Sequence, residues 1–168
     1  MNAPNFNGRD AITYGEKQPF IIDGPGEYEI RGITIKGVGL KTFYNNEEKI
    51  NTIYTVILEG TRLCFLGALE SPDLDRETLE SIGLVDLLFM PVGMRDKGDY
   101  GVLSPKDASK LSTALEPKII IPLYSSDEAL KQFLKEEGSS NAQSIDKLTI
   151  KKKDIEQKEG EIIVLKIS

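Results

Sequence analysis

The chemistry open to this chain is limited first by a side chain that it lacks. None of its 168 residues is a histidine. Imidazole is the commonest metal ligand in proteins, and it is the side chain whose pKa lies nearest to neutral pH. Without it the chain cannot form a histidine-rich zinc or iron site, a Ser–His or Cys–His nucleophile, or a histidine proton shuttle. Any catalytic site must therefore use other groups.

Four carboxylates in turn and loop segments could supply a metal site made of oxygen ligands. They are Asp23, Glu27, Asp96 and Asp99. Magnesium and manganese accept such ligands, so this set defines a hydrolytic alternative. A structural explanation is favoured for the first pair, because Pro25 and Gly26 between them are the residues that a type II turn requires. The second pair lies in a loop of mixed charge, which is typical of a solvated tip.

Two other groups with reactive or binding chemistry also have structural explanations. Cys64 lies within the apolar run Arg62–Leu66, and with no histidine to act as base we expect a buried, unreactive thiol. Lys151–Lys153 could contact an anionic partner. Acidic residues follow within a few positions, however, and we expect an exposed strand edge that is protected by charge.

Composition narrows the class of protein. Hydrophobic residues make up 39% and charged residues 29% of the chain, which suits one globular domain over residues 1–168. The net charge of −6 excludes a broad nucleic-acid surface, which needs a basic face. No apolar run approaches the ~20 residues that span a membrane, and a single cysteine is typical of a reducing compartment. We expect a cytoplasmic protein that binds neither nucleic acid nor membrane.

The elements that must position these residues differ between the two halves of the chain. Residues 1–18 are polar and aperiodic, which predicts a loop-like entry. Region 20–67 alternates apolar and polar residues and predicts antiparallel β-structure, with a bend or bulge at Gly32. Within it, two apolar runs flank Glu59–Thr61, a pattern that predicts a hairpin.

The second half alternates predicted strands with predicted helices. Continuous apolar runs at 87–92 and 118–122 indicate strands that are buried on both faces. Capping residues predict three helices. These helices are expected at 75–82 before Gly83, from Ser104–Pro105 onward, and from Ser125–Ser126 to Gly138. Residues 148–150 and 162–167 predict two final strands.

In their order, these segments resemble the metallo-β-lactamase fold, and within it the predicted zinc-dependent hydrolases related to ascorbate-6-phosphate lactonase. The matching stretches are FIIDGPGEYEI at 20–30, NTIYTVIL at 51–58, RLCFLG at 62–67, LLFMPVG at 87–93 and EPKIIIP at 116–122. The resemblance implies an α/β fold, an αββα sandwich that is truncated here by the lack of its N-terminal third. Its first half is rich in antiparallel strands, and strands alternate with helices in the second.

In that family a pair of zinc or manganese ions is bound by an H-x-H-x-D-H motif, a later His, an Asp after Gly, and a His after an Ile-Pro strand end. The resemblance carries these ligands onto Met1, Ala3, Asn5, Phe6, Tyr44, Ala68 and Tyr124. None of these side chains is an imidazole or a carboxylate, the donors that offset the dehydration of the ions. We therefore expect no metal, no cofactor and no catalytic residues.

The same positions define a residual pocket. Tyr44 and Tyr124 stand where imidazoles are expected, and Arg95 and Asp96 lie on a loop after a strand. Phenol hydroxyls in such a pocket could bind a small polar ligand. We favour the other interpretation, in which aromatic bulk fills the cavity that the metal ions leave.

These observations predict a catalytically inactive protein with a binding, scaffolding or subunit-pairing role. The alternative is a metal-dependent hydrolase of esters, lactones or phosphodiesters that uses the rearranged carboxylate site. A third hypothesis is a chain that completes the active site of another subunit. Because a partial sandwich exposes a sheet edge or an apolar face, we expect a homo-oligomer or a protein partner.

Overall fold

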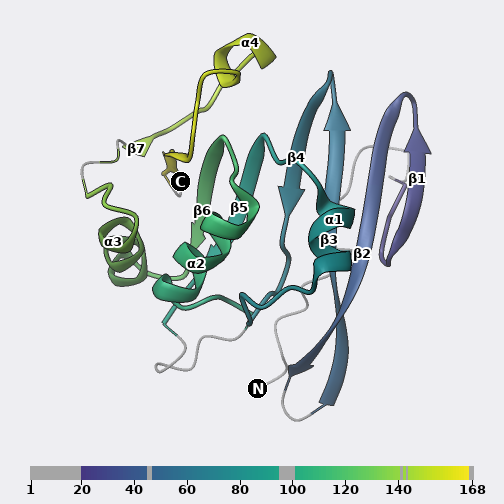
Figure 1. The fold of residues 1–168 in the computed structure, drawn as a ribbon, viewed down its shortest axis with the longest axis horizontal. Coiled ribbons are helices and arrows are strands. Elements are labelled where there is room, and N and C mark those ends of the chain that lie inside the picture. Colours follow the sequence, from purple (N-terminus) through teal and green to yellow (C-terminus); the bar gives the residue numbers. More distant parts are fainter. Residues whose placement is uncertain (1–19, 45–46, 95–100, 141, 143, 167–168) are drawn as a thin grey trace, which may run out of the picture.

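The computed structural model describes residues 20–44, 47–94, 101–140, 142 and 144–166. Within these residues the largest feature is a seven-stranded sheet in the order β1-β2-β3-β4-β5-β6-β8 (Figure 1). Its strands are β1 (Gly26–Ile30), β2 (Ile33–Tyr44), β3 (Glu47–Leu58), β4 (Thr61–Phe65), β5 (Leu87–Val92), β6 (Ile119–Tyr124) and β8 (Glu161–Ile162). The helices are α1 (Arg76–Ile82), α2 (Pro105–Leu115), α3 (Asp127–Glu136) and α4 (Lys152–Ile155). A small second sheet pairs β7 (Ser144–Ile145) with β9 (Val164–Leu165).

The first four strands form an antiparallel meander, and among the described residues tight turns join β1 to β2 and β3 to β4. Both central residues of each turn have positive φ, 51° and 79° at Arg31–Gly32 and 50° and 72° at Glu59–Gly60. Two-residue turns of this kind match the right-handed twist of the strands beside them. The hairpin predicted around Glu59–Thr61 is confirmed. At Gly32, where a bend or bulge is predicted, the chain reverses in a hairpin turn and there is no bulge.

The segment that leads into β1 also differs from its prediction. A type II turn at 24–27 needs φ near +80° at its third residue. The φ of Gly26 is +148°, and this glycine is already the first residue of β1. The chain therefore bends at Gly24–Pro25 and continues into the strand.

The remaining strands of the large sheet run parallel from β4 through β5 and β6 to β8. Helices α1, α2 and α3 begin where the capping residues predict. The side chains of Asp75, Ser104 and Ser126 each accept a hydrogen bond, of 2.7 to 3.2 Å, from the amide three residues later. These bonds satisfy amides that the helix itself leaves unpaired. Among the residues that the structure describes, no helix is long and apolar enough to cross a membrane.

Helices α1, α2 and α3 lie on one face of the sheet (Figure 1), and the main core lies between them and the strands. Successive residues of a strand point to opposite faces, so Leu88 and Met90 of β5 enter this core. Leu87 of β5 and Ile119 of β6 point to the opposite face, where they pack with Ile155. The C-terminal region, residues 145–165, therefore covers the second face of the sheet at β5 and β6.

The fold class is confirmed, since antiparallel strands fill the first half and strands alternate with helices in the second. Two details of the C-terminal region were predicted wrongly. Residues 148–150 form no strand, and Lys151–Lys153 form the N-cap and the first two residues of α4 and not a strand edge. The physical reason is packing, because Leu148 and Ile150 contact the second face of the sheet without extending it. The predicted strand at 162–167 is divided between the short β8 and β9.

Candidate functional site

A pocket of about 510 Å³ lies where β4 and β6 end. Parallel strands present their carboxyl ends at the same sheet edge, which is where α/β proteins place ligands. Ala68 follows β4 after Leu66 and Gly67, and Tyr124 is the last residue of β6. Both line this pocket, so the structure brings together two of the predicted site residues.

The turn after β4 is held by a buried amide. Asn51 of β3 donates from Nδ2 to the carbonyl oxygen of Leu66, and its Oδ1 accepts from the amide of Ala68, both at 2.8 Å. Gly67 between them has φ +66°, and a Cβ there would lie 2.4 Å from the Oδ1 of Asn51. Only glycine fits that position, because both the backbone and the contact exclude a side chain.

Asn51 belongs to the matching stretch NTIYTVIL at 51–58, and no role is predicted for it from the sequence. The sequence signal is a polar residue directly before the apolar run that starts at Ile53, and the structure shows that Asn51 is only 7% exposed. A buried amide must be hydrogen-bonded, which makes it a candidate for positioning a loop. Its partners lie 15 and 17 residues away along the chain, and the sequence alone does not identify them.

Tyr124 contributes bulk at the same edge. Its ring is half-buried and packs against the main core beneath α2 and α3. In register it pairs with Val92 of β5, whose carbonyl accepts the amide hydrogen of Ser125 at 3.0 Å. The side chain is thus placed by two strand ends, with one part in the core and another on the pocket wall.

The structure describes little of the other predicted site residues. Tyr44 is the last residue of β2, and its side chain is outside the description. Six further residues lie outside the described part of the chain. They are Met1, Ala3, Asn5, Phe6, Arg95 and Asp96.

The chemistry of the pocket is apolar. Its lining includes Phe89, Pro91 and Ile121. Among the described lining residues the only charged side chain is that of Lys166, which forms a 3.1 Å ion pair with Asp146. Within the described ranges no group of three or more His, Cys, Asp or Glu side chains is arranged to hold a metal ion. The described residues therefore do not fit the metal pair that the resemblance implies, because they offer it neither carboxylate nor imidazole.

The rearranged carboxylate site is not assembled by the described residues. Asp23 precedes β1 and Glu27 lies within it, at the edge of the sheet, whereas Asp96 and Asp99 lie outside the description. Strands β2 and β3 separate β1 from β4, which corresponds to about 14 Å at the usual strand spacing. Glu27 is 80% exposed, and its Oε1 lies 3.9 Å from Lys36 Nζ on the neighbouring strand.

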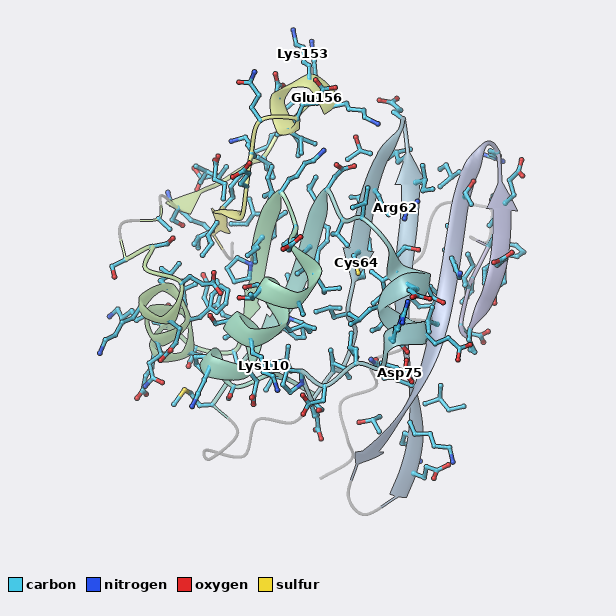
Figure 2. All side chains as sticks on the ribbon, in the orientation of Figure 1. Arg62, Cys64, Asp75, Lys110, Lys153 and Glu156 are labelled. Atoms are coloured by element: carbon cyan, nitrogen blue, oxygen red, sulfur yellow. The ribbon has the colours of Figure 1, made fainter. Side chains whose placement is uncertain are left out.

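Cys64 lies on β4, on the face that α1 covers (Figure 2), and is completely buried. Desolvation raises the pKa of its thiol to about 12. At neutral pH the group is therefore a protonated thiol, whereas the reactive form is the thiolate. The expectation of a buried thiol is confirmed.

The mixed sheet, the helices on one face and a pocket at the carboxyl ends of β4 and β6 define an α/β protein with a metallo-β-lactamase-like fold. A family model described as a beta-lactamase superfamily domain matches residues 7–124. The chain therefore belongs to the beta-lactamase superfamily.

Solved structures agree with this assignment. A proposed Zn-dependent hydrolase of the metallo-beta-lactamase superfamily from Thermotoga maritima is 28% identical, with a TM-score of 0.69 over 87% of this chain and 71% of that protein. YhfI, a metallo-beta-lactamase fold protein from Bacillus subtilis, is 13% identical, with a TM-score of 0.54 over 97% of this chain and 60% of that protein, and shows the fold alone. A search of curated proteins finds no match.

Proposed function

We propose that this chain is a catalytically inactive, metal-free member of the superfamily with a binding, scaffolding or subunit-pairing role. The observation that carries the proposal is the pairing of Ala68 and Tyr124 on one pocket wall. By the family resemblance both positions would hold metal ligands. Here they supply a methyl group and a phenol, which neither carry negative charge nor donate an imidazole nitrogen to a cation.

The surroundings of these two residues support the same proposal. The pocket is lined mainly by apolar side chains, and the charge of Lys166, at its wall, is compensated by the ion pair with Asp146. The turn that carries Ala68 keeps its shape through Asn51 and Gly67, both of which act within the protein itself. The described fold at this edge therefore needs no metal ion for its stability.

Metal analysis of the purified protein tests the proposal. We expect zinc, manganese and iron far below one equivalent per chain, and thermal melts that coincide in zinc, in manganese and in chelator. A ligand that binds only the folded state stabilises it by RT ln(1 + [L]/Kd), about 2.7 kcal/mol at a hundredfold excess over Kd. A stoichiometric metal, or a Tm that rises with free metal concentration, contradicts the proposal and favours the hydrolase.

A further inference from the structure

The segment between β7 and β8 is joined to the rest of the chain by backbone hydrogen bonds only at its two ends. It comprises residues 146–159, includes α4, and is called the strap below. Directly before it, the carbonyl oxygen of Ile145 accepts a hydrogen bond of 3.0 Å from the amide of Lys166, and β7 pairs with β9. Directly after it, the amide of Gly160 donates to the carbonyl oxygen of Pro117 at 2.9 Å.

Between these ends the backbone of the strap bonds only to itself. The amide of Asp154 donates to the carbonyl oxygen of Lys151 at 2.8 Å, and that of Lys158 donates to Ile155 at 2.9 Å. Among the residues that the structure describes, no backbone hydrogen bond joins 146–159 to another segment. The strap therefore has no ladder of hydrogen bonds that must break before it can move.

The polar contacts of the strap with its surroundings are made by side chains. They join Lys152 to the carbonyl oxygen of Gly60, Asp146 to Lys166, and Lys158 to Glu161. The side chain of Asp146 is 81% exposed and that of its partner 56%. Ion pairs on the surface contribute little to stability, so these contacts alone do not hold the strap down.

One apolar side chain anchors the strap to the second face of the sheet. Ile155 is the only buried residue among 146–159, and it packs in one cluster with Leu87 and Ile119. Leu148 and Ile150 lie against the same cluster and are only partly buried. The main core on the other face contains no residue of the strap. Withdrawal of Ile155 therefore leaves the main core intact.

The surface beneath the strap continues into the candidate pocket. On this face Leu87 of β5 pairs in register with Ile119 of β6, and the next pair along the same strands is Phe89 with Ile121. Two residues along a strand correspond to about 7 Å. The first pair belongs to the cluster that contains Ile155, whereas the second pair lines the pocket. The strap thus covers the amino-terminal end of an apolar strip whose other end is open.

We infer that the strap is a hinged cover, which opens while the sheet stays folded and thereby extends the pocket along β5 and β6. A segment with few buried contacts opens at a lower free energy than the whole protein unfolds. The closed strap limits the pocket to its Phe89–Ile121 end, and the open strap adds the Leu87–Ile119 pair. The regulatory part of the inference rests on the proposed function, because it assigns the cover to the pocket of a binding protein.

Alkylation of the full chain by iodoacetamide, with mass spectrometry to locate the label, tests the inference in Leu87→Cys and in Ile155→Cys. Cys64 is an internal standard in each variant, because it is completely buried in the main core and reports unfolding of the sheet. We expect the introduced thiol to react at least about tenfold faster than Cys64. Low concentrations of urea should hardly change its rate, since opening the strap exposes little surface, whereas the rate at Cys64 should rise steeply.

Met90→Cys is the matched control. Met90 lies on β5 like Leu87 and is equally inaccessible, at 0% exposed against 4%, but its side chain enters the main core. The thiol introduced at this position should react no faster than Cys64. Circular dichroism before labelling establishes that all three variants are folded.

Three results would overturn the inference. Equal rates and equal urea dependence at Cys64 and at the introduced thiols would mean that the strap moves only when the whole protein unfolds. Reaction in Ile155→Cys at the rate of an unfolded chain would mean that the strap has no closed state. Fast reaction in Ile155→Cys with slow reaction in Leu87→Cys would mean that opening does not uncover the strip. The labelling involves no metal and no ligand, so failure of the proposed function is seen separately in the metal analysis.

Discussion

Asn51 shows how a single side chain can define the geometry of a pocket that it does not line. Its two hydrogen bonds join β3 to the turn that carries Ala68, and both are buried. Gly67 permits the contact by having no Cβ. The shape of this edge therefore depends on an amide and a glycine, while the pocket wall depends on Ala68 and Tyr124.

Replacement of Asn51 by Ala should destabilise the protein by about 2–3 kcal/mol, because it leaves the carbonyl of Leu66 and the amide of Ala68 without their partner. Urea denaturation measures the change. Thr113→Ala is the control, because Thr113 is exposed on α2 and its hydroxyl donates only to the Ser109 carbonyl. It should alter the free energy of unfolding by less than about 0.5 kcal/mol. Equal effects of the two substitutions would contradict the role given to Asn51.

Cys64 gives a pH prediction. Its folded-state pKa is about 12 and its ordinary value 9.0, so between these values the unfolded chain loses the thiol proton and the folded chain keeps it. The contribution of this group to stability is complete below pH 9 and is lost as the pH rises toward 12. The stability advantage of wild type over Cys64→Ala should therefore shrink across this window. Urea midpoints at a series of pH values measure it, and a constant difference would contradict the burial.

At the scale of elements, the hairpin turns at Arg31–Gly32 and Glu59–Gly60 contain backbone strain that their residue types do not indicate. Arg31 and Glu59 occupy positive φ, although neither is glycine or asparagine. Such positions disfavour side chains with a Cβ, and asparagine and aspartate tolerate them best. Each turn is nevertheless fixed by the long strands on either side, of which β2 and β3 have twelve residues each.

The β3–β4 turn should accept a better residue. Glu59→Asn creates Asn-Gly, the preferred pair for a two-residue hairpin, and should stabilise the protein by about 0.5–1 kcal/mol. Glu59→Val should destabilise it, because a β-branched residue is poorly tolerated at positive φ. Chemical denaturation of both variants measures the difference. Loss of stability in the asparagine variant would contradict the turn geometry.

Elements that are marked by a local sequence pattern, such as an apolar run or a helix cap, were predictable. Strand β5 coincides with a continuous apolar run, and the helix beginning at Pro105 follows the cap of Ser104 on Asp107. A bend or bulge was predicted at Gly32, but not the full reversal of the chain, because arginine at position 31 gives no sign of positive φ. Leu148 and Ile150 suggested a strand, but apolar residues can cover a sheet face without pairing.

The candidate site was predictable to the extent that strand order fixes it. Ala68 follows β4 and Tyr124 ends β6, and both strands belong to the parallel part of the sheet, so strand order alone brings the two residues to one edge. The role of Asn51 depends on a contact across the β3–β4 hairpin, and no local pattern encodes it. The distance between Asp23 and this edge likewise depends on the order of the strands in the sheet.

At the scale of the whole molecule, the two faces of one sheet have different roles. Helices α1, α2 and α3 bury the first face in the main core, whereas the described C-terminal residues from 145 to 165 cover the β5–β6 end of the second. The pocket lies at the edge of the same sheet.

The shared acceptor of Tyr28 and Tyr54 also gives the molecule a built-in optical reporter. The chain has six tyrosines and no tryptophan, so phenol groups dominate its near-ultraviolet spectrum. Burial raises the pKa of Tyr54 above its ordinary value of 10.0. Ionisation in alkali removes the proton that it donates to Gly24, so an absorbance titration follows the loosening of this corner of the sheet without any attached dye.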